Sequence, residues 1–115
     1  MLPEDNRLRL KKDHDKVFKK GLRYKSPLFL LVYLSRHDQL PSRFSFIISK
    51  KVAKSAVLRN RVRRQLREAI RLNLGRIDRG YDCVFIINTN ILGIKTKEIS
   101  LIVEEVLRNI NILSN

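Results

Sequence analysis

The chain has 115 residues, of which 43% are hydrophobic, and this length fits one folded domain with a single modest core. Its formal net charge is +14, and its one cysteine, Cys83, excludes a disulfide framework and a cysteine-based zinc site. No apolar stretch is long enough to span a bilayer and the N-terminus lacks the apolar segment of a signal peptide, so we expect a cytoplasmic protein without membrane attachment. We expect residues 1–115 to form one domain, with residues 1–6 as a flexible tail.

Hydrophobic periodicity and turn residues divide the chain into helices and strands. The pattern predicts a first helix from Asp13, its N-cap, to about Lys20, strands at Leu22–Ser26, Leu28–Ser35, Arg43–Ser49 and Asp82–Thr89, and a last helix from Lys97 to about Leu113. A strand on each side of the central basic segment indicates a β-α-β unit, so we expect an α/β sandwich with a mixed sheet. The second and third strands, joined by a polar turn, favour an antiparallel hairpin.

The positive charge is concentrated in the middle of the chain. Residues 42–76 hold 11 basic side chains and one acid, Glu68. If this segment is helical, one apolar stripe faces the core and the arginines occupy the other sides. The stripe consists of Leu58, Val62, Leu66, Ala69 and Ile70, and the polar sides present Arg59, Asn60, Arg61, Arg63, Arg64, Arg67 and Arg71.

These arginines favour a nucleic-acid surface over an ordinary solvated helix face. A solvated face would need acids three or four residues away, and we expect only an Arg64–Glu68 pair to meet that requirement. Lys50, Lys51 and Lys54 precede the helix, where the helix dipole disfavours more positive charge unless an anion lies between them. A membrane-surface role fits less well, because the apolar stripe lacks the Trp or Phe of an interfacial helix.

The first helix offers a second candidate surface. His14 and Phe18 share one face of it, because they are four residues apart. From composition alone, ordinary core or boundary aromatics are the favoured interpretation of both residues. The alternative is a stacking platform for unpaired bases.

Side chains that could carry chemistry are scattered. The 11 acids do not cluster, the two histidines are separated by a helix and a strand, and no P-loop, dinucleotide-binding or HExxH pattern occurs. We therefore expect no catalytic residues and no metal site in the polypeptide.

Three motifs in order make the chain resemble the bacterial ribonuclease P protein subunit, from about Arg7 to the last helix. They are KVFKKG at Lys16–Gly21, SKK at Ser49–Lys51 and RNRVRRQLRE at Arg59–Glu68, of which the third is highly specific. The chain departs from the family pattern at His14, where Phe is frequent, and at Val32, where an aromatic residue is frequent.

The resemblance implies an αβββαβα order, a mixed, mainly antiparallel four-stranded sheet and an unusual left-handed β-α-β crossover. It also implies a holoenzyme whose catalytic RNA removes the 5′ leader of precursor tRNA, using Mg2+ held mainly by RNA and substrate. Those two RNAs would be the partners, and no dedicated protein partner is expected. Contacts to the catalytic RNA would come from Lys50, Lys51, Lys54, Arg59, Asn60, Arg61, Arg63, Arg64, Arg67 and Arg71, and the leader cleft from His14, Phe18, Leu30 and Val32.

Other functions remain as alternatives at the level of the sequence. A ribosomal or RNA-assembly protein would share the basic surface but would not need a cleft for an unpaired strand. A DNA-binding regulator would need a helix-turn-helix partner, which the β-rich flanks of the arginine helix do not favour. A protein-only nuclease lacks the clustered acids.

Overall fold

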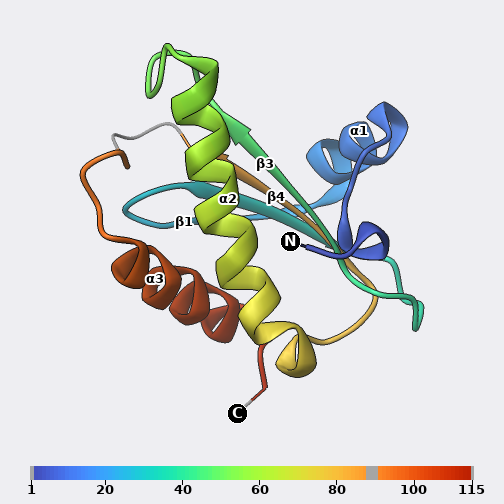
Figure 1. The fold of residues 1–115 in the computed structure, drawn as a ribbon. Helices are drawn as coiled ribbons and strands as arrows, with labels where there is room; N and C mark the ends of the chain where they lie inside the picture. Colours follow the sequence, from blue (N-terminus) through green and yellow to red (C-terminus); the bar gives the residue numbers. More distant parts are fainter. Residues whose placement is uncertain (1, 88–90, 115) are drawn as a thin grey trace.

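The computed structural model describes residues 2–87 and 91–114. Its elements, in order, are η1 (Glu4–Asn6), α1 (Lys11–Lys20), β1 (Leu22–Lys25), β2 (Leu30–Ser35), β3 (Arg43–Ile48), α2 (Ala56–Asn73), η2 (Leu74–Arg76), β4 (Tyr81–Ile87) and α3 (Thr96–Asn109). Apart from the two short 3-10 turns, this is the predicted αβββαβα order (Figure 1). The expected end of the fourth strand at Thr89 lies outside the described residues. Among the described residues, no helix has the length and apolar character needed to cross a membrane.

The four strands form one mixed sheet in the order β1-β2-β4-β3. Strand β4 is antiparallel to β2 and parallel to β3, so the predicted hairpin between β2 and β3 is wrong. The reason lies in the burial of the strands. Most of β4 is buried on both faces, which suits a central strand, whereas β3 alternates between buried and more accessible residues, which suits an edge.

Helix α2 makes the connection between the parallel strands β3 and β4. In Figure 1, α2 lies on the viewer's side of the sheet. If the picture is rotated until the parallel strands β3 and β4 point upward, β4 lies to the left of β3. The crossover is therefore left-handed, as the family resemblance implied and against the usual rule for such units.

The sheet has a core on each face. The larger core lies under α2 and α3, where Phe46 and Phe85 stack with ring centroids 5.2 Å apart and Leu66 and Val103 are fully buried. The smaller core lies under α1 and centres on Val17, together with the paired strand residues Val32 and Val84. One sheet thus separates the arginine helix from the first helix.

A flexible tail was predicted at residues 1–6, and within this segment Leu2 packs into the larger core and Glu4–Asn6 form η1. Leu2 is 1% exposed within the larger core. Arg7 forms a parallel bridge with Phe44 on the outer edge of β3, and the Leu8 N–H donates a hydrogen bond of 2.9 Å to the Phe44 carbonyl. The N-terminal segment therefore covers part of an otherwise open strand edge.

Two helix boundaries differ from the prediction. Helix α1 begins at Lys11 rather than after an Asp13 cap, because the Asp13 carboxylate binds Arg43 on the sheet instead. Helix α3 ends at Asn109, not near Leu113, because Asn111 adopts a positive φ of 64° and turns the chain. Leu113 then bridges Ile77 as extended backbone.

Candidate nucleic-acid interface

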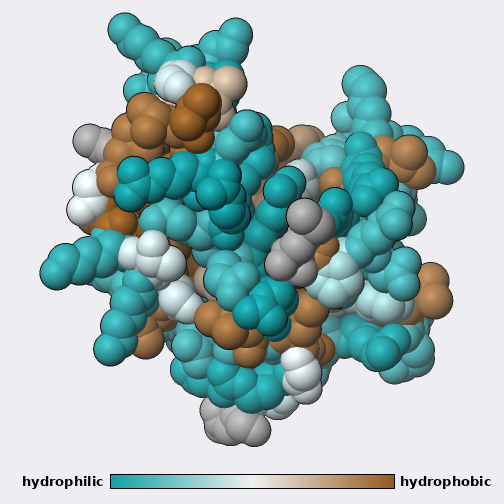
Figure 2. All heavy atoms as spheres, viewed as in Figure 1, coloured by the Kyte–Doolittle hydropathy of each residue, from teal (hydrophilic) through white to brown (hydrophobic). Residues whose placement is uncertain are grey.

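Helix α2 is anchored by its apolar stripe. The Ser55 side chain caps it by accepting a hydrogen bond of 3.1 Å from the Val57 N–H. Val62, Leu66 and Ile70 are buried against the larger core, as their spacing predicted, and Leu58 is half-buried. The arginine positions between them are thereby turned toward the flanks and the solvent side. Figure 2 shows hydrophilic side chains over the middle of α2, with apolar patches toward its ends.

The most accessible part of α2 lacks negative partners. Asn60, Arg61 and Arg64 are exposed, and Arg61 and Arg64 have no hydrogen bond or ion pair with the residues that the structure describes. The predicted Arg64–Glu68 pair is wrong. Glu68 instead binds Arg71, with 2.9 Å between Arg71 Nε and Glu68 Oε2, and the Arg71 hydrogen bond lowers the pKa of Glu68. Arg71 is thus neutralised within the helix, and Arg64 is not.

Arg59 and Arg63 are fixed by backbone carbonyls. Arg59 Nη1 donates to the carbonyls of Ala53 and Lys54 at 2.9 and 2.8 Å. Arg63 Nε donates to the Phe46 carbonyl of β3 at 3.3 Å. Both side chains are only partly exposed. They therefore hold the preceding loop and the neighbouring strand as well as carrying charge.

Arg67 lies deeper on the flank than Arg61 or Arg64. Partial burial lowers its pKa, and the positive charges of Arg7 and Arg63 lower it further. A hollow of about 630 Å3 on this flank is lined by Asn60, Arg63, Arg64, Arg67 and Glu68. Arg7 is a further cation near this flank that the sequence analysis did not assign to the basic surface, because it lies far from α2 along the chain.

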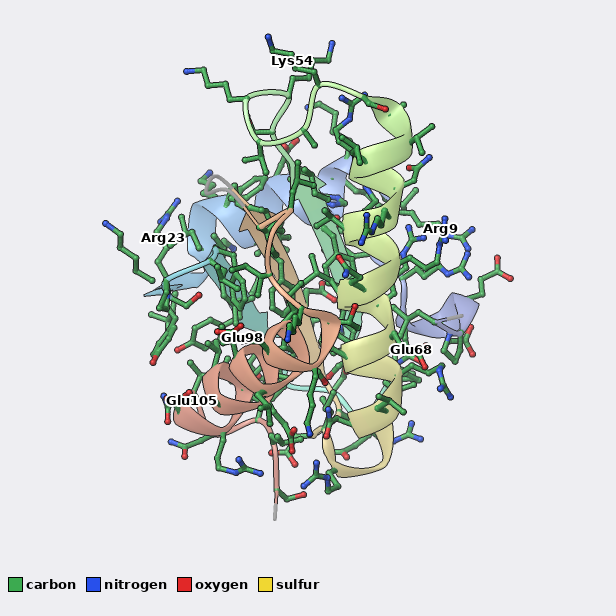
Figure 3. The ribbon with its side chains drawn as sticks, turned by 60° about the vertical axis from the view of Figure 1, so that its left-hand side comes forward. Arg9, Arg23, Lys54, Glu68, Glu98 and Glu105 are labelled. Atoms are coloured by element: carbon green, nitrogen blue, oxygen red, sulfur yellow. The ribbon has the colours of Figure 1, made fainter. Side chains whose placement is uncertain are left out.

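A lysine loop precedes α2. Lys50, Lys51 and Lys54 are all exposed in the turn between β3 and α2, and the Ser49 carbonyl accepts backbone hydrogen bonds from Val52 and Ala53 there. Figure 3 shows Lys54 in this loop, pointing away from the domain near the beginning of α2. The loop, which we call the lysine loop (residues 49–55), extends the basic surface beyond the helix.

The opposite face of the sheet carries an apolar strip. Leu30, Ile86 and Ile47 are paired neighbours across β2, β4 and β3, and they share the α1 side of the sheet. Helix α1 covers the next row, so that Val32 is 0% exposed, whereas Ile47 is 39% exposed. Phe18 of α1 is half-buried and, like Leu30 and Ile86, packs against the smaller core. The accessible apolar strip therefore consists of Phe18, Leu30, Ile47 and Ile86.

Phe18 and Leu30 of the predicted cleft both border the smaller core on the α1 side of the sheet, but Val32 and His14 lie differently from the prediction. Val32 supports the strip from beneath α1 and offers no surface of its own. His14 is engaged through both ring nitrogens, with Ser45 Oγ at 2.8 Å and the Leu10 carbonyl at 2.9 Å. Ile47 and Ile86 were missed, although Ile47 gave a signal as an apolar residue on the polar side of the alternation in β3.

A buried ionic network holds α1 against the sheet. Asp82, only 4% exposed, accepts hydrogen bonds from Arg36 and from Arg43, whose Nη2 lies 2.7 Å from Asp82 Oδ2. Arg43 Nη1 also reaches Asp13 of α1 at 3.2 Å. The hydrogen bonds that Arg43 donates to Asp82 raise the pKa of Arg43 against the effect of partial burial. The network fixes the first helix relative to β3 and β4 and so sets the position of the apolar strip.

Other reactive groups do not gather into a site. Across residues 2–87 and 91–114, no group of three or more His, Cys, Asp or Glu side chains could hold a metal ion. Cys83 is fully buried in the core, and its burial raises the pKa of the thiol.

The chain is similar to known proteins in both sequence and fold. The family model described as Ribonuclease P matches residues 2–111. The ribonuclease P protein component of Alkaliphilus oremlandii is 36% identical over 110 residues, covering 96% of this chain and 95% of the relative. The RNase P protein of Staphylococcus aureus matches the fold with a TM-score of 0.84 at 24% identity, over 95% of this chain and 98% of that one. The RNase P protein of Thermotoga maritima matches with a TM-score of 0.80 at 25% identity, over 90% and 96% of the two chains.

Proposed function

This chain belongs to the ribonuclease P protein family, and on that premise we propose that it binds the catalytic RNA of ribonuclease P and the 5′ leader of precursor tRNA. In this proposal the holoenzyme, in the cytoplasm, hydrolyses precursor tRNA to release the leader and leave a mature 5′ end. The polypeptide supplies binding and positioning, and the RNA supplies catalysis.

The observation that carries the proposal is the absence of acid partners on α2. Of its arginines within the described residues, Arg71 alone pairs with a carboxylate. Arg61 and Arg64 are exposed and have no hydrogen bond or ion pair with the described residues. Like charges this close repel one another, and an RNA backbone would offset that repulsion while accepting bidentate hydrogen bonds from guanidinium groups.

The apolar strip supports the second half of the proposal. An unpaired leader exposes base faces that a duplex hides, and base faces stack on aromatic and aliphatic side chains. Phe18, Leu30, Ile47 and Ile86 offer such a surface, and Lys25 lies opposite Leu30 on β1, where its charge could approach the leader backbone. Mature tRNA, which lacks the leader, would not use this surface.

Mg2+ enters the proposal only through the RNA. Asp13 and Asp82, on the α1 side of the sheet, are held by arginines, and Asp15 of α1 pairs with Lys11. Among the described residues, no group of three or more His, Cys, Asp or Glu could hold a metal ion. The described side chains therefore do not fit a protein-held ion, and we propose that Mg2+ is bound mainly by RNA and substrate. No step assigned to the polypeptide uses the metal.

A double substitution on α2 tests the RNA-binding surface. Replacing Arg61 and Arg64 together by alanine should weaken binding of the catalytic RNA and reduce the slope of log affinity against log salt by up to about 2, because two phosphate contacts are lost. Both side chains are exposed, so the unfolding midpoint of the free protein should stay the same. Arg108→Ala on α3, whose arginine lies beside Glu104, is the control and should leave the slope unchanged. An unchanged slope in the double variant would refute the assignment of this surface.

A further inference from the structure

The N-terminal segment brings a basic residue to the flank of α2. Arg7 pairs with Phe44 on the outer edge of β3, and Arg63 donates to the carbonyl of Phe46 on the same strand. Two residues along a strand correspond to about 7 Å, so these arginines attach to one strand edge at neighbouring points. Figure 3 shows Arg9, two residues after Arg7, on the same side of α2 as Glu68.

Hydrogen bonds to the backbone hold two of the guanidinium groups in place. Arg7 Nε donates to the Leu2 carbonyl at 2.9 Å, and Leu2 is itself buried in the core. Arg63 is fixed through Nε on Phe46. Arg63 Nη1 also donates to Asn60 Oδ1 at 3.0 Å, which leaves its Nη2 group available, whereas both terminal groups of Arg7 are available. The Arg67 guanidinium has no hydrogen bond or ion pair with the described residues. Donors fixed in this way lose little conformational freedom when an anion binds.

The three cations are not neutralised by the protein. Arg7, Arg63 and Arg67 form no ion pair with the acids that the structure describes, and the positive charges of Arg7 and Arg63 lower the pKa of Arg67. Glu68 lines the adjacent hollow, but its carboxylate is occupied by Arg71. The free protein therefore carries an electrostatic cost here that a bound anion would relieve.

We infer that Arg7, Arg63 and Arg67 together bind a backbone phosphate of RNA, so that the N-terminal segment is part of the RNA-binding surface. The inference rests on the proposed function and adds to it a site built from two segments of the chain. The phosphate belongs either to the catalytic RNA or to precursor tRNA, and the chemistry of recognition is the same for both.

Substitutions at Arg7 test the site. Arg7→Gln should weaken RNA binding several-fold and reduce the salt slope by about 1, because one phosphate contact is lost. Arg7→Lys should keep the salt slope, because it keeps the charge. Loss of affinity for the catalytic RNA alone would identify that RNA as the source of the phosphate, whereas a loss seen only when the assembled holoenzyme binds precursor tRNA would identify the substrate.

Two further variants separate this inference from the proposed function. Arg61→Gln tests the α2 surface, and Arg108→Gln on α3 is the matched control, expected to bind as the wild type does. If Arg61→Gln reduces the salt slope and Arg7→Gln leaves it unchanged with both RNAs, the inference is wrong and the proposed function stands. If neither variant changes the slope, both fail. A purely structural role for Arg7 would instead appear as a lower unfolding midpoint for Arg7→Gln and Arg7→Lys alike, without a change in slope, and would overturn the inference.

Discussion

Arg59 and Arg61 are two residues apart in the sequence, and the structure gives them different surroundings. Arg59 donates to two carbonyls at the end of the lysine loop, whereas Arg61 has no partner among the described residues. Both belong to the same basic motif, so the pattern of charges predicts the same RNA-binding role for both. Their contacts thus distinguish Arg59, which holds the loop, from Arg61, whose unpaired guanidinium contacts RNA in the proposed function.

This difference gives a prediction about stability. Arg59→Ala should lower the free energy of unfolding by about 1–2 kcal/mol, because charged hydrogen bonds to the loop carbonyls are lost. Arg61→Ala should change it by less than about 0.5 kcal/mol, as is usual for an exposed side chain without partners. Urea unfolding of the two RNA-free variants measures both values. Equal stability of the two variants would show that the Arg59 contacts do not hold the loop.

The sequence shows which side chains are charged, but it did not predict which of them form ion pairs. Glu68 has Arg64 four residues before it and Arg71 three residues after it, and both spacings permit an ion pair on a helix. The structure pairs it with Arg71, whose bidentate contact leaves Arg64 free. Such a choice depends on side-chain geometry and neighbours, which spacing along the helix does not specify.

At the scale of elements, the periodicity of the sequence located each helix and strand within a few residues. It could not give the order of the strands, because the pairing of a strand depends on what lies beside it in three dimensions. β4 is far from β2 and β3 in sequence, yet it lies between them. Residues 1–6 were predicted as a tail, and the burial of Leu2 in the larger core could not be predicted from the sequence, because it depends on what packs against Leu2 in three dimensions.

The apolar strip gives a prediction at this scale. Ile47→Ala should weaken binding of precursor tRNA by about 1 kcal/mol and leave binding of mature tRNA unchanged, because an accessible surface for an unpaired base is reduced. Val32→Ala should instead lower the free energy of unfolding by about 2 kcal/mol, because it leaves a cavity under α1. Affinities of the holoenzyme for the two tRNA forms, measured beside unfolding curves, check both outcomes. Equal losses for precursor and mature tRNA in Ile47→Ala would contradict the cleft assignment.

At the scale of the whole molecule, one sheet carries two different surfaces. The arginine helix and the larger core occupy one face, and the apolar strip with α1 occupies the other. Figure 3 shows Glu98 and Glu105 on α3, on the other side of the view from Arg9. Exposed lysines also lie along α1, so basic side chains are present on both faces of the sheet, and the proposed binding of two RNAs would use both.

The central claim is that the RNA cleaves precursor tRNA, whereas the polypeptide binds and positions the RNAs. The most direct test is cleavage of precursor tRNA by the catalytic RNA at low Mg2+, with and without this chain, and by the chain alone. We expect the chain to increase cleavage by the RNA strongly, with a larger effect on substrates that carry a leader, and the purified polypeptide alone to cleave nothing. Leader removal by the polypeptide without RNA, or no effect of the chain on cleavage by the RNA, would contradict the claim.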